Sequence, residues 1–299
     1  MPDKIEVIKR FQKLQSYICD SLEQADKKST FSKESWVHHS GGGGLTRIIE
    51  NGQYIQKGGV NFSSVEGILP EKIAHALGLP LNSVYLATGV SIVMHPQNPF
   101  APIMHMNVRY FELANGTYWF GGGIDMTPHY VDLQDAKYFH KEVKRVCDDF
   151  HKDAYDAQKK NADDYFFNIH RDETRGVGGT FFDRMTDNNL YTKTQILNYC
   201  CSILDLFPKI YTYFIHKNNQ PFTEKERIWQ DIRRGRYVEF NLVYDKGTKF
   251  GLDTNGRVES ILMSLPKTAQ WHYNFTPLEN SQEAFTQQYL KKNIDWLSF

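Results

Sequence analysis

The chain has 299 residues, and its 35 Lys and Arg balance its 35 Asp and Glu. A chain of zero net charge has no general field that would attract nucleic acid or an anionic membrane, so we expect neither as a partner. A charged ligand must therefore be recognised by a local group of residues.

Cysteine usage and hydropathy indicate a cytoplasmic protein. The four cysteines include no C-x-x-C pair, which favours buried, reduced thiols over disulfides or a metal site. No apolar run approaches the ~18 residues of a membrane span. The first residues mix acids with bases and contain no continuous apolar stretch, so a signal or transit peptide is not expected.

The first half of the chain predicts one helix followed by strands. Apolar residues recur at steps of three and four over residues 5–22, which is typical of an amphipathic helix. Residues 36–62 change to glycine-punctuated short strands, and we interpret "GGGG" at 41–44 and "KGGVNFS" at 57–63 as flexible strand connections. Further strands are predicted over 83–94, 103–113 and 117–123.

The second half predicts long helices and then strands. Residues 134–160 and 191–217 have helical patterns. Residues 233–265 alternate with period two and contain Asn-Gly at 255–256, which predicts two or three antiparallel strands. A helix is expected from about Ser281. No repeat or linker divides the chain, so we expect residues 1–299 to form one α+β domain.

One predicted strand has an unusual polar face. Successive side chains of a strand point to opposite faces, so His105, Asn107 and Arg109 share one face, and apolar residues occupy the other. A half-buried strand normally exposes Thr, Lys or Glu to solvent. The imidazole on this face makes His105 the best candidate for a general acid or base.

Several arginines lie beside glycines, aromatics or apolar strands instead of in lysine-rich surface runs. They are Arg109, Arg171, Arg175, Arg233, Arg234, Arg236 and Arg257. Arginine binds carboxylates through two parallel hydrogen bonds and keeps its charge when partly desolvated, so this set suits a polyanionic small molecule. Any one of them could instead form a structural ion pair, and Arg171, next to two acids, fits that alternative best.

Asp125 and four histidines could carry chemistry. Asp125 follows three glycines and precedes Thr-Pro, so it could be a turn or helix-cap residue, or a fixed anion in a pocket lined by Trp119 and Phe120. His95, His105, His140 and His170 could meet around a metal, although their spacing fits neither a helical H-x-x-x-H pair nor a Cys/His finger. The alternative is a mixture of core histidines and one catalytic imidazole. No nucleotide or nucleophile motif occurs, so no organic cofactor is indicated.

Seven segments, in order, closely resemble the motifs of the oxygen-dependent coproporphyrinogen III oxidase family. They are "GGVNFS", "ATGVSIVMHPQNP", "HMNVRYFE", "WFGGGIDMTPHY", "IHRDETRGVGGTFFD", "RRGRYVEFNLVYDKGTKFGL" and "GRVESILMSLP". The resemblance runs from about residue 10 to the C-terminus. It implies a large, mostly antiparallel sheet flanked by helices on both faces, and a homodimer that pairs through about residues 237–272.

The resemblance also implies a reaction. Two propionate side chains of coproporphyrinogen III would be oxidatively decarboxylated to vinyl groups, giving protoporphyrinogen IX in haem synthesis. Molecular oxygen would be the oxidant, and no organic cofactor would take part. Two other functions stay open, namely a non-catalytic tetrapyrrole-binding protein and a metal-dependent oxygenase that acts on another substrate.

Roles follow from the matching positions. Ser91, the segment 107–109 (Asn107, Val108, Arg109) and the segment 255–257 (Asn255, Gly256, Arg257) match substrate contacts, although the family usually has Gly where Asn255 stands. His105 matches the proposed proton donor, and Asp125 matches the acid that engages the pyrrole N–H groups. The four histidines match a divalent-metal set whose requirement is disputed in the family. We predict His105, Asp125 and Arg109 as catalytic and Arg175 as a further substrate-binding residue.

Overall fold

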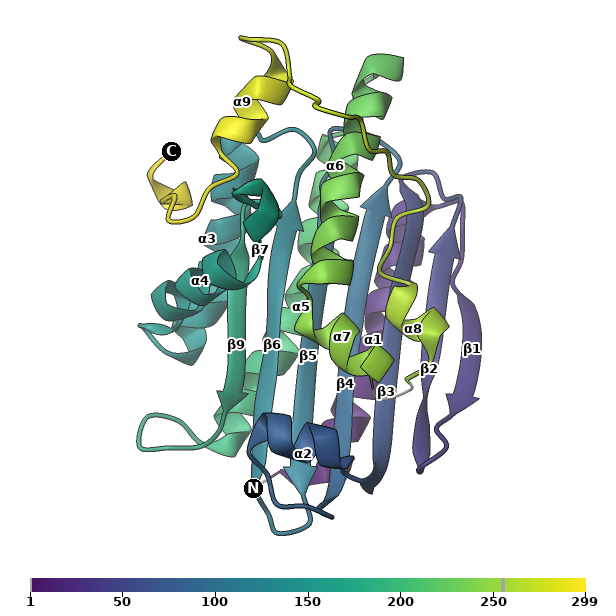
Figure 1. Ribbon diagram of the computed structural model, residues 1–299, viewed down its shortest axis with the longest axis vertical. Helices are drawn as coiled ribbons and strands as arrows, with labels where there is room; N and C mark the ends of the chain where they lie inside the picture. Colours follow the sequence, from purple (N-terminus) through teal and green to yellow (C-terminus); the bar gives the residue numbers. More distant parts are fainter. Residues whose placement is uncertain (1, 254–255) are drawn as a thin grey trace.

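A computed structural model describes residues 2–253 and 256–299. Its centre is a seven-stranded antiparallel sheet in the order β1-β2-β3-β4-β5-β6-β9 (Figure 1). The strands are β1 (Ser32–Val37), β2 (Gly42–Glu50), β3 (Ile55–Ile68), β4 (Val84–Pro96), β5 (Ile103–Leu113), β6 (Tyr118–Thr127) and β9 (Gly179–Met185). The predicted α+β fold class is confirmed.

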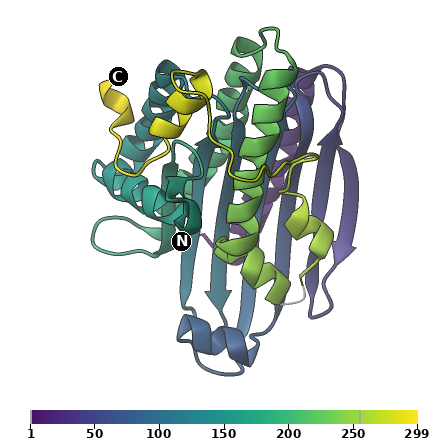
Figure 2. The same cartoon turned by 45° about the horizontal axis from the view of Figure 1, so that its top comes forward.

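Helices cover both faces of this sheet (Figures 1 and 2). One face carries α1 (Lys4–Asp26) and α5 (Lys193–Lys217), which pack on each other and against the apolar face of the strands. The opposite face carries α6 (Glu224–Val243), α7 (Lys246–Asp253) and α8 (Val258–Leu262). Apolar residues of α1 such as Phe11 and Ile18 are fully buried, so its amphipathic pattern has the predicted packing role.

Shorter elements complete the chain. α2 (Glu71–Leu77) connects β3 to β4, and α3 (Leu133–Phe150) and α4 (Ala154–Tyr165) follow β6. A strap made of β7 (Phe167–Asn168), the 3₁₀ helix η1 (Ile169–Arg171) and β8 (Glu173–Thr174) leads to β9. The chain ends with α9 (Gln282–Gln288) and η2 (Trp296–Ser298). Within the described residues, no helix combines the length and apolar character that a membrane span requires.

Most of the predicted elements are present, but two details before residue 161 were wrong. The predicted helix over 134–160 is interrupted at 151–153, where α3 ends and α4 begins. Gly41 lies in the connection between β1 and β2, as predicted. The glycines at 42–44 belong to β2 and "KGGVNFS" lies in the middle of β3, so these are not connections. A Cβ atom on Gly43 would lie 2.1 Å from the carbonyl oxygen of Trp36, which explains why glycine is required inside this strand.

The predicted strands over 233–265 are wrong, because this segment forms α6, α7 and α8. A capping box between Thr223 and Glu226 begins α6, and its buried residues Trp229, Arg233, Tyr237 and Phe240 recur at steps of three and four. A buried arginine on that face counts as polar in a hydropathy pattern and conceals the helical period. Of the Asn-Gly turn signal, Asn255 lies outside the described residues.

Candidate active site

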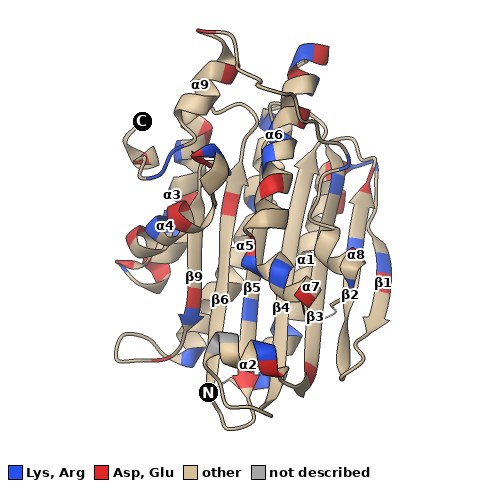
Figure 3. Cartoon of the chain, in the orientation of Figure 1, with Lys and Arg blue, Asp and Glu red and all other residues tan. Residues whose placement is uncertain are grey.

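Pairing between β4, β5 and β6 places Ser91, His105, Asn107 and Asp125 side by side on one face of the sheet, and we call this group the strip. His105 lies opposite Asp125, Asn107 lies opposite Gly123, and Ser91 pairs with Asn107 from the other side. These residues share the face toward α6, because neighbours in register point the same way. The central strands carry only isolated charged residues, whereas acids and bases mix freely over the helices (Figure 3).

Asp125 is a buried carboxylate held by two partners. Its side chain is 2% exposed, and its Oδ1 accepts hydrogen bonds from His105 Nδ1 at 2.9 Å and from Arg175 Nη2 at 2.6 Å. Its Oδ2 accepts from Arg175 Nε at 3.1 Å. Burial alone would raise the pKa of Asp125, but Arg175 and His105 outweigh burial and lower it. Asp125 is therefore ionised at neutral pH.

Arg175 was predicted to bind substrate, but its guanidinium is committed to Asp125. The side chain is 1% exposed and lies over the rings of Phe166, Tyr237 and Phe240 at 4.4, 4.8 and 4.6 Å. Its Nη1 donates to Asn241 Oδ1 at 3.3 Å. Burial lowers the pKa of Arg175, but the charge of Asp125 opposes burial, and the net result is a pKa above the ordinary arginine value. Arg175 therefore holds Asp125 in position, and its guanidinium is too buried to bind a propionate of the substrate.

His105 is the member of this group that reaches the surface. Its side chain is 14% exposed. The acceptor Asp125 fixes the proton on Nδ1, which leaves Nε2 as a proton acceptor with Asn107 Nδ2 at 3.4 Å. The geometry is a chain of three groups, in which Arg175 holds Asp125, Asp125 orients His105, and His105 faces outward.

The surroundings of Asp125 differ from the predicted pocket. Phe120 lies in the core on the opposite face, and Trp119 stacks on Phe111 with ring centroids 4.3 Å apart. Val108, predicted as a substrate contact, is also fully buried in that core, so only its backbone belongs to the strip. In both cases, a one-residue step along a strand reverses the face.

Arg109 extends the strip away from Asp125. It lies on the exposed part of β5 between Gly89 and Gly121, and a Cβ atom on Gly121 would be 3.7 Å from its Nη2. Among residues 2–253 and 256–299, no hydrogen bond or ion pair occupies its guanidinium. Arg109 is consequently available for an anionic ligand, and its contact with substrate stays a prediction.

A cavity of about 230 Å³ adjoins this strip. The sheet contributes Trp36, Asn61 and Ser63, and Asn61 pairs in register with Ser91. The helical side contributes Phe250, Gly256, Arg257 and Ser260. The structure thus places two of the predicted contacts, Gly256 and Arg257, in the lining of this cavity. The third, Asn255, lies outside the described residues.

Comparison with known proteins decides the family. The profile of the family named Coproporphyrinogen III oxidase matches residues 6–296. The chain belongs to this family.

Its relatives come from animals, plants and bacteria. The chain is 43% identical to the mitochondrial oxygen-dependent coproporphyrinogen-III oxidase of Rattus norvegicus, with 99% of this chain and 69% of the relative aligned. It is 43% identical to the chloroplastic enzyme of Glycine max, over 92% of this chain and 75% of the relative. For the enzyme of Prochlorococcus marinus (strain NATL1A) the identity is 43%, over 95% and 88%.

The four histidines that the family resemblance suggests as a metal set lie in separate networks. His95 bonds the Ser264 carbonyl through Nε2, and both ring nitrogens of His140 are occupied, by the Tyr155 hydroxyl and the Val177 carbonyl. Burial lowers the pKa of His95 and of His140 to about 3. Over the described part of the chain, no three His, Cys, Asp or Glu side chains are placed to hold a metal ion. The donor set does not fit a divalent metal.

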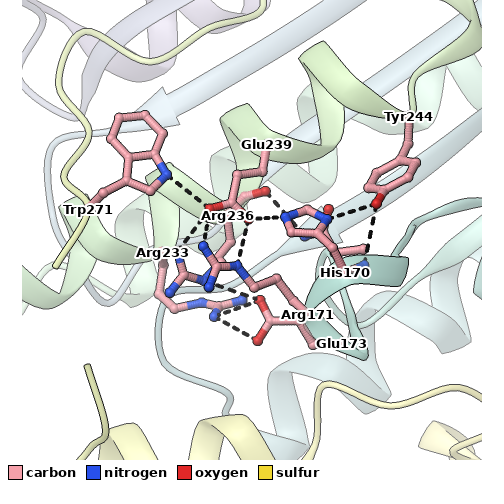
Figure 4. Close-up of polar contacts among 9 residues, drawn as sticks. His170, Arg171, Glu173, Arg233, Arg236, Glu239, Tyr244 and Trp271 are labelled. Carbon is pink, nitrogen blue, oxygen red and sulfur yellow. Dashed lines mark hydrogen bonds and ion pairs between the residues drawn. The ribbon is translucent and has the colours of Figure 1, made fainter. Parts of the chain in front are cut away.

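His170 and Arg171 belong to a charged network between the strap and α6 (Figure 4). Glu239 accepts hydrogen bonds from His170 Nε2 at 2.7 Å and from two nitrogens of Arg171 at 2.7 and 2.9 Å. Arg236 and Trp271 also donate to it, and these partners overcome burial and lower its pKa to about 2. The structural alternative for Arg171 is confirmed.

The same network has a second carboxylate that the sequence did not reveal. Glu173 accepts from Arg233 Nη1 at 3.1 Å, and Arg236 lies 3.9 Å away (Figure 4). Two residues after Glu173 comes Arg175, so the network fastens to α6 the strap that delivers the partner of Asp125. The pairing of Glu173 with Arg233 and of Glu239 with Arg171 has no local sequence signal, because these partners are 60 and 68 residues apart.

Proposed function

We propose that this protein carries out the oxygen-dependent oxidative decarboxylation of two propionates of coproporphyrinogen III, giving protoporphyrinogen IX in haem synthesis. One observation carries the proposal: the partly exposed His105 keeps Nε2 as an acceptor beside the Asn107 amide, while Asp125, ionised and held by Arg175, bonds Nδ1. A tetrapyrrole offers pyrrole N–H donors at its centre and four carboxylates at its rim. On one face of the sheet, the strip offers a proton acceptor, His105, and a guanidinium, Arg109, that has no hydrogen-bond partner among the described residues.

The residues suggest a division of labour. Both oxygens of Asp125 already accept hydrogen bonds, so we assign the contact with a pyrrole N–H to His105 and the stabilisation of the resulting imidazolium to Asp125. Arg109 would bind one propionate in the forked geometry that guanidinium groups favour, and Arg257 at the cavity would bind another. The strip would thereby fix the substrate relative to His105.

The chemistry needs no resident redox group. A pyrrole made electron-rich by loss of its proton can react with oxygen directly, and the peroxide so formed takes a hydrogen from the propionate β-carbon. Loss of carbon dioxide then leaves the vinyl group. For each side chain, the propionate carboxylate, oxygen and one proton give vinyl, carbon dioxide and hydrogen peroxide. The protein would supply proton transfer by His105 and orientation by the arginines.

We also propose that turnover does not depend on a metal held by the four histidines. The proposal is supported by the occupied nitrogens of His140 and by the burial of His95. Exhaustive chelation should leave activity intact. A loss that one added divalent ion restores would contradict the proposal.

A homodimer that pairs through about residues 237–272 is a further proposal. Exposed apolar side chains are concentrated there, namely Leu242, Val243, Phe250, Leu252, Val258 and Trp271. Such a group is typical of an interaction surface. The described part of this segment forms the end of α6, then α7, α8 and irregular chain, so pairing would occur through helices and loops and not by adding strands. Sedimentation of Val258→Lys should show dissociation toward monomer.

We propose that the protein acts in the cytoplasm, together with coproporphyrinogen III and oxygen. All four cysteines are buried and unpaired, which suits a reducing compartment. Fractionation of cells that express the chain would test this.

The decisive experiment compares conversion of coproporphyrinogen III under air and under argon by the purified chain. The expected result is protoporphyrin fluorescence, after re-oxidation, only under air. Tight porphyrin binding without oxygen uptake would identify a carrier and refute the enzymatic function.

A further inference from the structure

Arg257 is paired with an acid from a distant strand. It lies just before α8 and lines the 230 Å³ cavity, and its Nη2 donates to the carboxylate of Glu34 on β1. The side chain of Glu34 is 65% exposed, whereas that of Arg257 is 23% exposed. The hydrogen bond from Arg257 lowers the pKa of Glu34, so the pair is charged at neutral pH. A carboxylate of the protein thus occupies a guanidinium that faces the candidate ligand cavity.

This ion pair is not what holds α8 on the sheet. Ser260 of α8 contacts Thr46 of β2 through their hydroxyl oxygens at 2.8 Å, in a buried position. Thr46 in turn donates to Asn61 and accepts from Trp36 Nε1 at 3.1 Å. α8 therefore has a buried attachment of its own, and loss of the exposed pair leaves that attachment intact.

We propose that Glu34 is a resident substitute for a substrate carboxylate, which holds Arg257 until a propionate of the tetrapyrrole displaces it. The inference rests on the proposed function, since it names the group that competes at the same site. Exposed ion pairs are weak and salt-screened, so exchange between two carboxylates has a small net cost. A substrate already held at His105 and Arg109 presents its next propionate at high local concentration, which favours displacement.

Such a competitor contributes to selectivity as well as to affinity. A ligand with a carboxylate near Arg257 replaces one ion pair by another. A ligand that lacks this carboxylate cannot compensate Arg257, so Glu34 stays in place and continues to occupy the guanidinium. Glu34 is thus a specificity-determining residue, and it requires no contact with the reacting atoms.

The test uses Glu34→Gln, which keeps the shape of the side chain but removes its charge. The matched control is Lys72→Gln. Lys72 forms an exposed ion pair at 3.3 Å with Asp253 of α7, so the control loosens the same helical region without involving Arg257. We expect the KM for coproporphyrinogen III to fall about two- to fivefold in Glu34→Gln, with kcat maintained, and to stay unchanged in Lys72→Gln.

Binding provides a second readout that does not depend on turnover. Trp36 lines the cavity, so coproporphyrin III should quench its fluorescence, and the Kd should fall by the same factor in Glu34→Gln. An unchanged or raised KM and Kd would overturn the inference. An equal change in both variants would also overturn it, because the effect would then come from mobility of the helices. If wild type does not convert coproporphyrinogen III, the proposed function fails, while the binding comparison still decides the role of Glu34.

Discussion

Replacing Asp125 by Asn should separate the structural from the catalytic role of this carboxylate. The substitution keeps the size of the side chain but leaves the guanidinium of Arg175 as an uncompensated charge, 1% exposed within three aromatic rings. Breaking a buried ion pair by removing one partner costs about 3–5 kcal/mol in the free energy of unfolding. Loss of fixed charge at a reaction centre should also reduce kcat by about 10²-fold or more.

The double variant Asp125→Asn/Arg175→Met distinguishes these effects. Methionine fills the aromatic cage of Phe166, Tyr237 and Phe240 without charge, so the pair of substitutions should destabilise less than the sum of the single ones, by about 0.5–3 kcal/mol. Activity should stay low in Asp125→Asn and in the double variant, because neither has a carboxylate at position 125 to orient His105.

Urea denaturation would give the free energies, and protoporphyrin fluorescence under air would give the rates. Additive stability changes would refute the buried ion pair. Near-normal turnover by folded Asp125→Asn would refute the catalytic role of the carboxylate.

Three further predictions concern His105, Glu239 and the glycine at position 123. His105→Asn should lower kcat by about 10²- to 10⁴-fold, because it removes the proton-transfer group. The melting temperature should stay nearly unchanged, because this partly exposed side chain contributes little to the core. Normal turnover would exclude His105 as the proton-transfer group. The pKa of Glu239 is lowered from its ordinary value of 4.5 to about 2 in the folded protein, so its ionised form stabilises the fold above about pH 4.5, and this contribution disappears as the pH falls toward 2. The difference in unfolding free energy between wild type and Glu239→Gln should therefore shrink between pH 4.5 and 2. A difference independent of pH would contradict the assignment. Gly123→Ala should destabilise the pairing of β6 with β9, because its Cβ atom would lie 2.4 Å from the carbonyl oxygen of Thr180. Gly67→Ala is the control, because its Cβ atom first meets the side chain of Ser40, which can move. Equal denaturation midpoints for the two variants would show that β9 adapts to the added methyl group.

The arrangement of the strip explains why part of the site could be predicted from sequence. Side chains alternate along a strand, so the common face of His105, Asn107 and Arg109 follows from their spacing once β5 is recognised. The same alternation puts Val108 on the core face, and its side chain is indeed buried. Any contact of Val108 with substrate is therefore limited to its backbone. The helical period of α1 is likewise local, and its packing face could be predicted for that reason.

The helices α6, α7 and α8 show where local patterns mislead. Arg233 and Arg234 are buried in α6, and their charges are accommodated by Glu173, Asp231 and the Pro96 carbonyl. A pattern that assigns arginine to the surface therefore loses the period of three and four. The capping box at Thr223 and Glu226 was the visible signal that a helix begins there.

Sequence by itself determined the family, the central strands β4 to β6 and the face on which His105 lies, because these depend on ordered motifs and on the geometry of a single strand. Only the tertiary structure decided that Arg175 pairs with Asp125, 50 residues earlier, that the four histidines lie in separate networks, and that Glu34 occupies Arg257. These are contacts between segments far apart in the chain, and the position of an ion-pair partner leaves no trace in the residues next to it.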